Sequence, residues 1–200
     1  MVRPDSAARV KAYSEESRLV YLNDITLDQS GRPVILVVTS ASHRPGPQGD
    51  PRTWEVLHYR EGAWRTHEVT TSTHNYDTGP LQVEPDGTWR VVGPTERGPQ
   101  RWGGGGEIAV WTSRDQGATW AKTRDVTRDS PRNHSYVRRV IGAEPDSPFA
   151  LLWADGHADD LSVSRLYFAD REGRVVRRLP YDMDGDHAVP EILGSGTQGH

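Results

Sequence analysis

Two short segments of the chain bring together residue types that transfer protons and bind polar ligands. The first contains His74, Asn75, Tyr76 and Asp77, and the second contains Asn133, His134, Ser135, Tyr136, Arg138 and Arg139. Histidine and tyrosine serve as general acids and bases, and a guanidinium group pairs with a carboxylate. Polar and titratable groups of this kind, gathered in one pocket, are what a sugar-binding or sugar-cleaving site would need.

The sequence lacks the signatures of several other chemistries. Its 200 residues include no cysteine, which excludes disulfides and thiolate chemistry. It has no G-x-S-x-G, no phosphate-binding glycine loop and no H-E-x-x-H. The net charge of -4 and the pI near 6.1 argue against a nucleic-acid partner. A mean hydropathy of -0.73 argues against a membrane partner.

A repeat supplies the elements that must position these groups. Residues 19–70, 71–127 and 128–180 each contain four strand-like runs bounded by Gly, Pro, Asp or Asn. The glycine before the fourth run recurs at Gly62, Gly117 and Gly173, steps of 55 residues (62 to 117) and 56 residues (117 to 173). Four-stranded units with a fixed period are typical of β-propeller blades. We therefore predict an all-β fold of about three four-stranded antiparallel blades, a partial propeller with the first strand of each blade innermost.

The lengths of the connections predict where the two polar segments lie. Within each unit the second-to-third connection is long, whereas the first-to-second and third-to-fourth connections are short hairpins. Because strands alternate in direction, the long loops share one rim with the segments that enter each first strand. The two polar segments, with Asn23 and Asp24 of the first unit, should therefore converge near the axis, where Glu107 adds a carboxylate. The alternative is that these histidines and tyrosines only fill the central channel of the propeller and form hydrogen bonds with neighbouring backbone groups.

One turn is specific for a type of propeller. Ser113, Asp115, Gly117, Thr119 and Trp120 match S-x-D-x-G-x-T-W, the Asp-box of sialidase-type propellers. The serine and aspartate side chains can bind turn amides, the glycine allows a positive φ, and the tryptophan packs beneath the hairpin. We assign this turn a structural role and no part in catalysis.

Longer runs resemble a known family. LVYLNDITLD, HNYDTGPLQVEPDGTWRVVGPTE, WTSRDQGATW, SPRNHSYVRR and LLWADGH with SRLYF are similar to a BNR-repeat, sialidase-like propeller family. That family includes ulvan and rhamnose–glucuronate polysaccharide lyases, and the resemblance spans residues 19–180. It implies β-elimination at a uronic acid, which needs a group that neutralises the carboxylate, a base and an acid.

The resemblance also implies roles for individual residues. His134, Tyr136, Arg139 and His74 are the candidate catalytic residues: a histidine or Tyr136 as base, Tyr136 also as acid, and an arginine to neutralise the carboxylate. The candidate substrate-binding residues are Asn75, Tyr76, Arg138, Asn133 and Glu107. The family's complete members are longer, so missing blades or self-association would complete this chain.

Two other functions remain open at this point. A sialidase-like glycoside hydrolase could use Tyr136, Glu107 and the arginine pair, although three arginines at matching positions are not found. A non-catalytic, glycan-binding or degenerate propeller is the other alternative. In each case the expected partner is an acidic polysaccharide or another glycan.

The remaining expectations concern cofactors, location and the chain ends. No cofactor is expected, and a structural calcium ion is left open because Asp155, His157, Asp159 and Asp160 cluster in sequence. No apolar signal stretch follows Met1, and the complete protein is expected to be secreted or periplasmic. Residues 1–18 should be the end of a preceding blade or a short helix, and residues 181–200 a loose polar tail.

Overall fold

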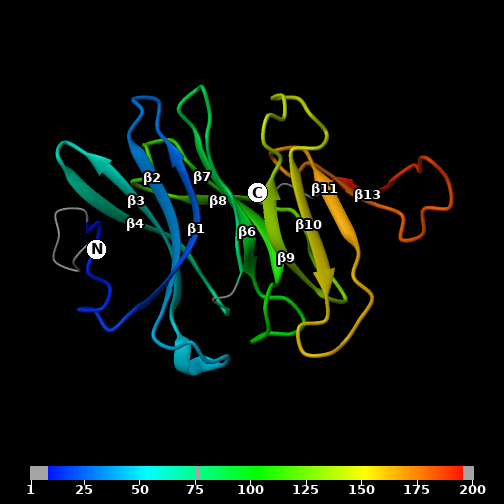
Figure 1. Ribbon diagram of the computed structural model, residues 1–200, viewed down its shortest axis with the longest axis horizontal. Helices are drawn as coiled ribbons and strands as arrows, with labels where there is room; N and C mark the ends of the chain where they lie inside the picture. The colour runs from blue at the N-terminus through cyan, green and yellow to red at the C-terminus, as the bar shows by residue number, and fades with distance from the viewer. Residues whose placement is uncertain (1–8, 75–76, 196–200) are drawn as a thin grey trace.

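The computed structural model describes residues 9–74 and 77–195, which form three antiparallel sheets in chain order (Figure 1). Sheet 1 contains β1 (Leu19–Leu27), β2 (Pro33–Ser40), β3 (Arg52–Arg60) and β4 (Ala63–Ser72). Sheet 2 contains β5 (Leu81–Val83), β6 (Trp89–Glu96), β7 (Glu107–Ser113) and β8 (Ala121–Asp125). Sheet 3 contains β9 (Asn133–Arg139), β10 (Leu151–Gly156), β11 (Leu166–Ala169), β12 (Val175–Arg178) and β13 (Glu191–Ser195). Within each sheet every strand pairs with its neighbour in sequence, and the predicted all-β architecture is confirmed.

The three sheets stack face to face, and two apolar layers hold them together. Trp54 and Val56 of sheet 1 pack with Trp89 and Val91 of sheet 2. The opposite face of sheet 2 packs on sheet 3 through a second cluster, which includes Val92, Ile108, Val110, Trp153 and Tyr167. Successive residues of a strand point to opposite faces, so Val91 and Val92 belong to different layers. Sheet 2 is therefore covered on both faces, as a blade is between its neighbours.

The hairpin turns explain why glycine repeats in the sequence. The repeated glycines all have positive φ: +78° at Gly62, +84° at Gly117 and +64° at Gly173. In the 113–120 turn, Asp115 accepts hydrogen bonds from the Thr119 amide at 2.9 Å and the Thr119 hydroxyl at 2.6 Å. Ser113 Oγ accepts one from the Gly117 amide at 2.8 Å. These are the turn bonds expected from the sequence, and their role is local.

Both chain ends differ in part from the expectation. Residues 191–195 do not belong to a loose tail, because β13 pairs with β12 and makes sheet 3 five-stranded. At the other end, residues 9–18 form turns rather than a helix or a strand. Tyr13 packs on Val37 and Leu57 and donates a hydrogen bond to Glu55 at 2.7 Å. This segment covers part of the free face of sheet 1.

Much of the two outermost sheet faces stays uncovered. On β1, Val20, Leu22, Ile25 and Leu27 are exposed apolar side chains. At the opposite end of the stack, sheet 3 exposes Phe149, Leu166 and Ile192, among other residues. In the part of the chain that the structure describes, no helix is long and apolar enough to span a membrane.

Candidate functional site

The first strands of the three sheets are joined by aspartate side chains. Asp24 on β1 accepts a hydrogen bond from the Leu81 amide of β5 at 2.9 Å. One sheet further on, Asp77 accepts a hydrogen bond from the Tyr136 amide of β9 at 2.7 Å. Arg139 of β9 forms an ion pair with Asp24 of β1, with 3.6 Å between Arg139 Nη2 and Asp24 Oδ1. The first strands therefore converge on a common axis, as the topology predicted.

Tyr136 lies on the innermost strand of sheet 3 with an unusual backbone. Its φ is +57°, a left-handed value that residues other than glycine rarely adopt in a strand. The pairing of β9 with β10 shifts at this point, between Leu152 and Ala154. The side chain is 56% exposed, while the amide is held by Asp77 from the neighbouring blade. Backbone strain that is fixed by surrounding contacts is typical of functional positions.

Two arginines follow Tyr136 and surround a small cavity at the axis. Arg138 and Arg139 are both exposed, and with Asn23 and Asp24 of β1 they line a cavity of about 210 Å³. Burial raises the pKa of Asp77 to about 7, although the Tyr136 and Thr78 amides and the charge of Arg138 act in the opposite direction. The second carboxylate oxygen of Asp77 has no hydrogen-bond partner in the described structure. The positive charge of Arg138 is therefore opposed by a carboxyl group that is only partly ionised at neutral pH, whereas Arg139 faces Asp24.

The two candidate histidines lie on the same rim. His74 follows β4 and donates from Nε2 to the Pro94 carbonyl in β6, at 2.8 Å. His134 is the second residue of β9, and its backbone bridges to Gly106, beside the start of β7. Because β6 ends where β7 begins, both histidines lie at that end of sheet 2, and the 113–120 turn lies at the other. However, both side chains are buried, with 3% of His74 and 5% of His134 exposed.

The contacts of His134 determine which nitrogen carries its proton. Trp153 Nε1 can only donate, so His134 Nδ1 accepts its hydrogen bond at 3.0 Å. The neutral ring then donates from Nε2 to Ser130 Oγ at 3.0 Å, and Ser130 donates to Glu107 at 2.9 Å. Burial lowers the pKa of His134, which favours this neutral form. Ser130, His134 and Glu107 thus resemble a catalytic triad in composition, but the hydrogen bonds run in the wrong direction to activate the serine.

His74 has a different environment. Burial lowers its pKa to about 4, and the charge of Arg52 contributes to the same effect. Its Nδ1 is buried and has no hydrogen-bond partner among the described residues. The imidazole is neutral at physiological pH and keeps one unoccupied acceptor. The role of either histidine as a base stays a prediction.

The candidate binding residues Asn133 and Glu107 contact neighbouring loops of the protein. The Asn133 amide donates to the carbonyls of Gln100 and Gly104, at 2.9 and 3.0 Å, and so fixes the loop between β6 and β7. Glu107 accepts a hydrogen bond from the Ser130 amide at 2.7 Å. Their role in substrate binding stays a prediction, and Asn75 and Tyr76 lie outside the described residues.

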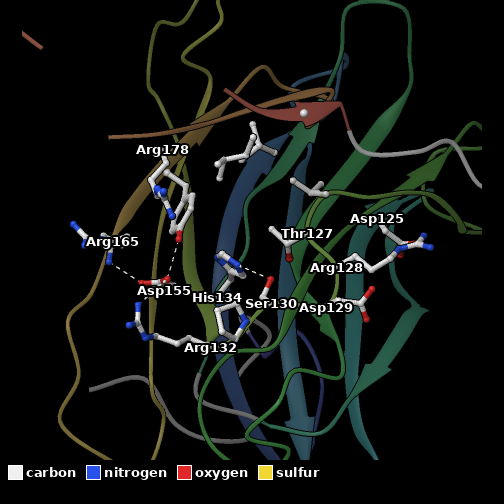
Figure 2. Close-up of a pocket in the computed structure, with 16 residues that line it drawn as sticks. Asp125, Thr127, Arg128, Asp129, Ser130, Arg132, His134, Asp155, Arg165 and Arg178 are labelled. Atoms are coloured by element: carbon white, nitrogen blue, oxygen red, sulfur yellow. Dashed lines mark hydrogen bonds and ion pairs between the residues drawn. The ribbon is translucent and has the colours of Figure 1, made fainter. Parts of the chain in front are cut away.

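A larger cleft, of about 600 Å³, opens between sheets 2 and 3 on the side of their outer strands (Figure 2). Among the candidate catalytic and binding residues that the structure describes, His134 alone lines it. The other polar residues of the cleft are Asp125, Thr127, Arg128, Asp129, Ser130, Arg132, Asp155, Arg165, Tyr167 and Arg178. For Asp155, the sequence did contain a signal. Alternation along the strand LLWADG places Asp155 on the same face as Trp153, toward sheet 2. Most of the others belong to the continuous segment 125–132 that leads from β8 to β9, and Arg165, Tyr167 and Arg178 lie in or next to β11 and β12 of sheet 3.

The residues considered for a calcium ion do not converge. Asp155 accepts a hydrogen bond from the Tyr167 hydroxyl at 2.9 Å. His157 Nδ1 accepts hydrogen bonds from the amides of Asp159 and Asp160, at 3.3 and 3.1 Å. In residues 9–74 and 77–195, no three histidine or acidic side chains are grouped so as to hold a metal ion.

Comparisons with known proteins bear on the fold. No family model matches the sequence, and no curated protein matches it. Two solved structures of an ulvan lyase of polysaccharide lyase family PL25, one of them bound to -[GlcA(1-4)Rha3S]-, are similar to the chain with a TM-score of 0.58 and 16% sequence identity. The similarity covers 78% of this chain and 33% of the lyase, so the chain spans about a third of that protein. The three sheets thus match part of a propeller-type ulvan lyase in fold.

Proposed function

We propose that the chain is part of a carbohydrate-active propeller that cleaves a uronate-containing polysaccharide by β-elimination. The reaction takes place at the axial surface, defined here as Tyr136, Arg138, Arg139 and Asp77. The observation that carries the proposal is the exposed Tyr136, fixed in a left-handed conformation beside two arginines on the innermost strand. The similarity in fold to an ulvan lyase supports a substrate of this class.

The residue types of the axial surface suit the steps of the reaction. β-Elimination removes the C5 proton of a uronic acid and expels the oxygen at C4, which leaves a C4–C5 double bond. A cation on the uronate carboxylate stabilises the carbanion-like transition state, and Arg138 or Arg139 provides that charge. In this proposal Tyr136 transfers the proton, either from C5 or to the leaving oxygen.

The uncovered sheet faces support a larger protein. Exposed apolar strands such as β1 are normally paired or covered. We infer that further four-stranded sheets of the same kind pack on them in the complete protein. Because the polysaccharide is encountered outside the cytoplasm, the proposal includes a secreted or periplasmic location.

A non-catalytic, glycan-binding propeller is the second candidate. It is favoured by the burial of both histidines, because Nε2 of His74 is bound to the Pro94 carbonyl and Nε2 of His134 to Ser130. Such a protein would bind uronate polysaccharides without forming an unsaturated product.

Ultraviolet absorbance of the unsaturated uronate product separates the two candidates. The complete protein is incubated with ulvan and with other uronate polysaccharides, and the variants are Arg138→Gln and Arg139→Gln. Arg177→Gln on β12 is a matched control, because Arg177 packs over Phe168 away from the axis. Product formation that is lost in the axial variants and kept in the control supports the lyase. Binding of the polysaccharide without any product supports the second candidate and refutes the first.

A further inference from the structure

The interblade cleft between sheets 2 and 3 is separate from the axial surface. We define it by residues 125–132 with His134, Asp155, Arg165, Tyr167, Val176, Arg178, Leu193 and Gly194. Its volume of about 600 Å³ falls in the range of small-molecule sites. Val126, Tyr167 and Val176 belong to the apolar layer between the two sheets and form its inner wall. The cleft therefore combines an apolar wall with a polar mouth.

The buried carboxylate of the cleft is satisfied by the protein itself. Asp155 Oδ1 accepts a hydrogen bond from the Arg165 amide at 2.7 Å, and Oδ2 accepts one from the Tyr167 hydroxyl at 2.9 Å. Arg132 Nη1 is 3.5 Å from Oδ2, longer than the usual charge-assisted hydrogen bond. Arg132 therefore keeps most of its hydrogen-bonding capacity for another acceptor.

Two more arginines, Arg165 and Arg178, also line the cleft (Figure 2). The Arg165 side chain lies 4.4 Å over the ring of Tyr181, a contact that leaves its N–H edge open. Arg178 is paired with Glu191. Since each guanidinium has five N–H donors, the cleft has many more donors than its own acceptors occupy. This excess of donors fits a ligand rich in acceptor oxygens.

Apart from Asp129, an exposed carboxylate at the mouth of the cleft, the remaining titratable groups do not oppose an anion. Burial, followed by the hydrogen bond and charge of Asp155, raises the pKa of Tyr167 to about 12, so the phenol is uncharged. Both nitrogens of His134 are occupied by Trp153 and Ser130. Arg128 neutralises Asp125 at 2.6 Å.

We propose that the interblade cleft binds a sugar residue that carries a carboxylate or a sulfate. The anionic group lies against Arg132 and Arg165, and the apolar face of the sugar lies against Tyr167 and Val176. The choice of a sugar as ligand rests on the proposed function, whereas the preference for an anion rests on the arginines alone.

Calorimetric titration with three probes tests this site: methyl glucuronide, methyl rhamnoside 3-sulfate and uncharged methyl glucoside. The double variant Arg132→Gln/Arg165→Gln should bind the acidic probes at least roughly tenfold more weakly, the loss expected for one charge-assisted hydrogen bond. Arg177→Gln should bind them like the parent protein. Comparison of the two acids shows whether carboxylate or sulfate is preferred. Failure of both acids to bind, unchanged affinity in the double variant, or equal affinity for methyl glucoside would overturn the proposal.

A second pair of variants separates this site from the axial surface. Tyr136→Phe and Arg139→Gln should leave acidic-probe binding in the cleft unchanged, because neither residue lines it. Loss of probe binding in these variants, with normal binding in the double variant, would assign the anion to the axial surface and overturn the cleft site. If the parent protein forms no unsaturated product and yet the double variant loses probe binding, the cleft stands and the proposed lyase does not. Urea unfolding of each variant confirms that it is folded during the titration.

Discussion

Replacement of Asp77 by asparagine should stabilise the protein at pH 8. Asp77 is buried between the first strands of sheets 2 and 3, and burial raises its pKa to about 7 from an ordinary value of 3.8. Asparagine keeps the Oδ1 acceptor for the Tyr136 and Thr78 amides, at 2.7 and 2.6 Å, and removes the buried charge. The side-chain oxygen that lacks a partner in the described structure would be replaced by an uncharged amide group.

The sign of the effect follows from proton binding. Because the folded-state pKa is raised, the folded protein holds the proton more tightly than the unfolded chain does. The contribution of Asp77 to stability is therefore greatest below pH 4 and is lost as the pH rises to 7. A difference of about three pKa units corresponds to about 4 kcal/mol, an upper estimate of this loss.

Urea unfolding of both proteins at several pH values between 4 and 8 measures this difference. The free energy of unfolding of Asp77→Asn, relative to the parent protein, should increase with pH and level off above pH 7. Buried histidines such as His74 also titrate in this range, but both proteins contain them and their effect cancels in the difference. A stability difference that does not change with pH, or a less stable variant at pH 8, would refute the conclusion that Asp77 is buried and partly protonated.

Other substitutions test the turns and the packing of the first strands. Asp115→Ala should lower stability by about 1–2 kcal/mol in urea unfolding, through the lost turn bonds, and should leave activity per folded molecule unchanged. Asp186→Ala, in the exposed segment before β13, is its control, and an equal effect of the two would contradict the assigned turn. Hydrogen bonding from Thr119 lowers the pKa of Asp115 to about 2, so this contribution should be present above pH 4 and disappear as the pH falls to 2. Gly79→Ala would place a Cβ 2.2 Å from the Val92 carbonyl oxygen and should lower the free energy of unfolding by about 1–3 kcal/mol. Gly104→Ala, which meets no atom within 4 Å, should change stability by less than about 0.5 kcal/mol, and similar losses at both positions would contradict the close packing at Gly79.

The repeat made much of the fold predictable. Recurrent glycines such as Gly62 and Gly117 mark hairpins that need a positive φ, and that need recurs once in each blade. The topology then placed His74 and His134 on one rim and the first strands at the axis. β13 was missed because Glu191–Ser195 is short and contains a glycine, so its pairing depends on the free edge of β12 rather than on its own pattern.

The directions of side chains were less predictable than their positions. His134 lies near the start of an inner strand, but its ring turns into the layer between sheets 2 and 3 because Trp153 and Ser130 offer hydrogen bonds there. Ser130 is only four residues away in sequence, but Trp153 lies on β10, and nothing in the sequence near residue 134 indicates that contact. The same is true of the cleft, where Arg132 and Arg165 meet at Asp155 only after sheet 3 has formed.

The most direct test of the axial surface compares Tyr136→Phe with Tyr59→Phe. Both variants lose one hydroxyl from an exposed tyrosine, but Tyr59 lies on β3 beside Trp64, away from the first strands. The measurement is the initial rate at which each variant of the complete protein forms unsaturated uronate from ulvan. Tyr136→Phe should be slower by about 10²–10⁴-fold, as expected for loss of a proton-transfer group, and Tyr59→Phe should match the parent protein. Full activity in Tyr136→Phe, or an equal loss in both variants, would contradict the assignment of catalysis to this surface.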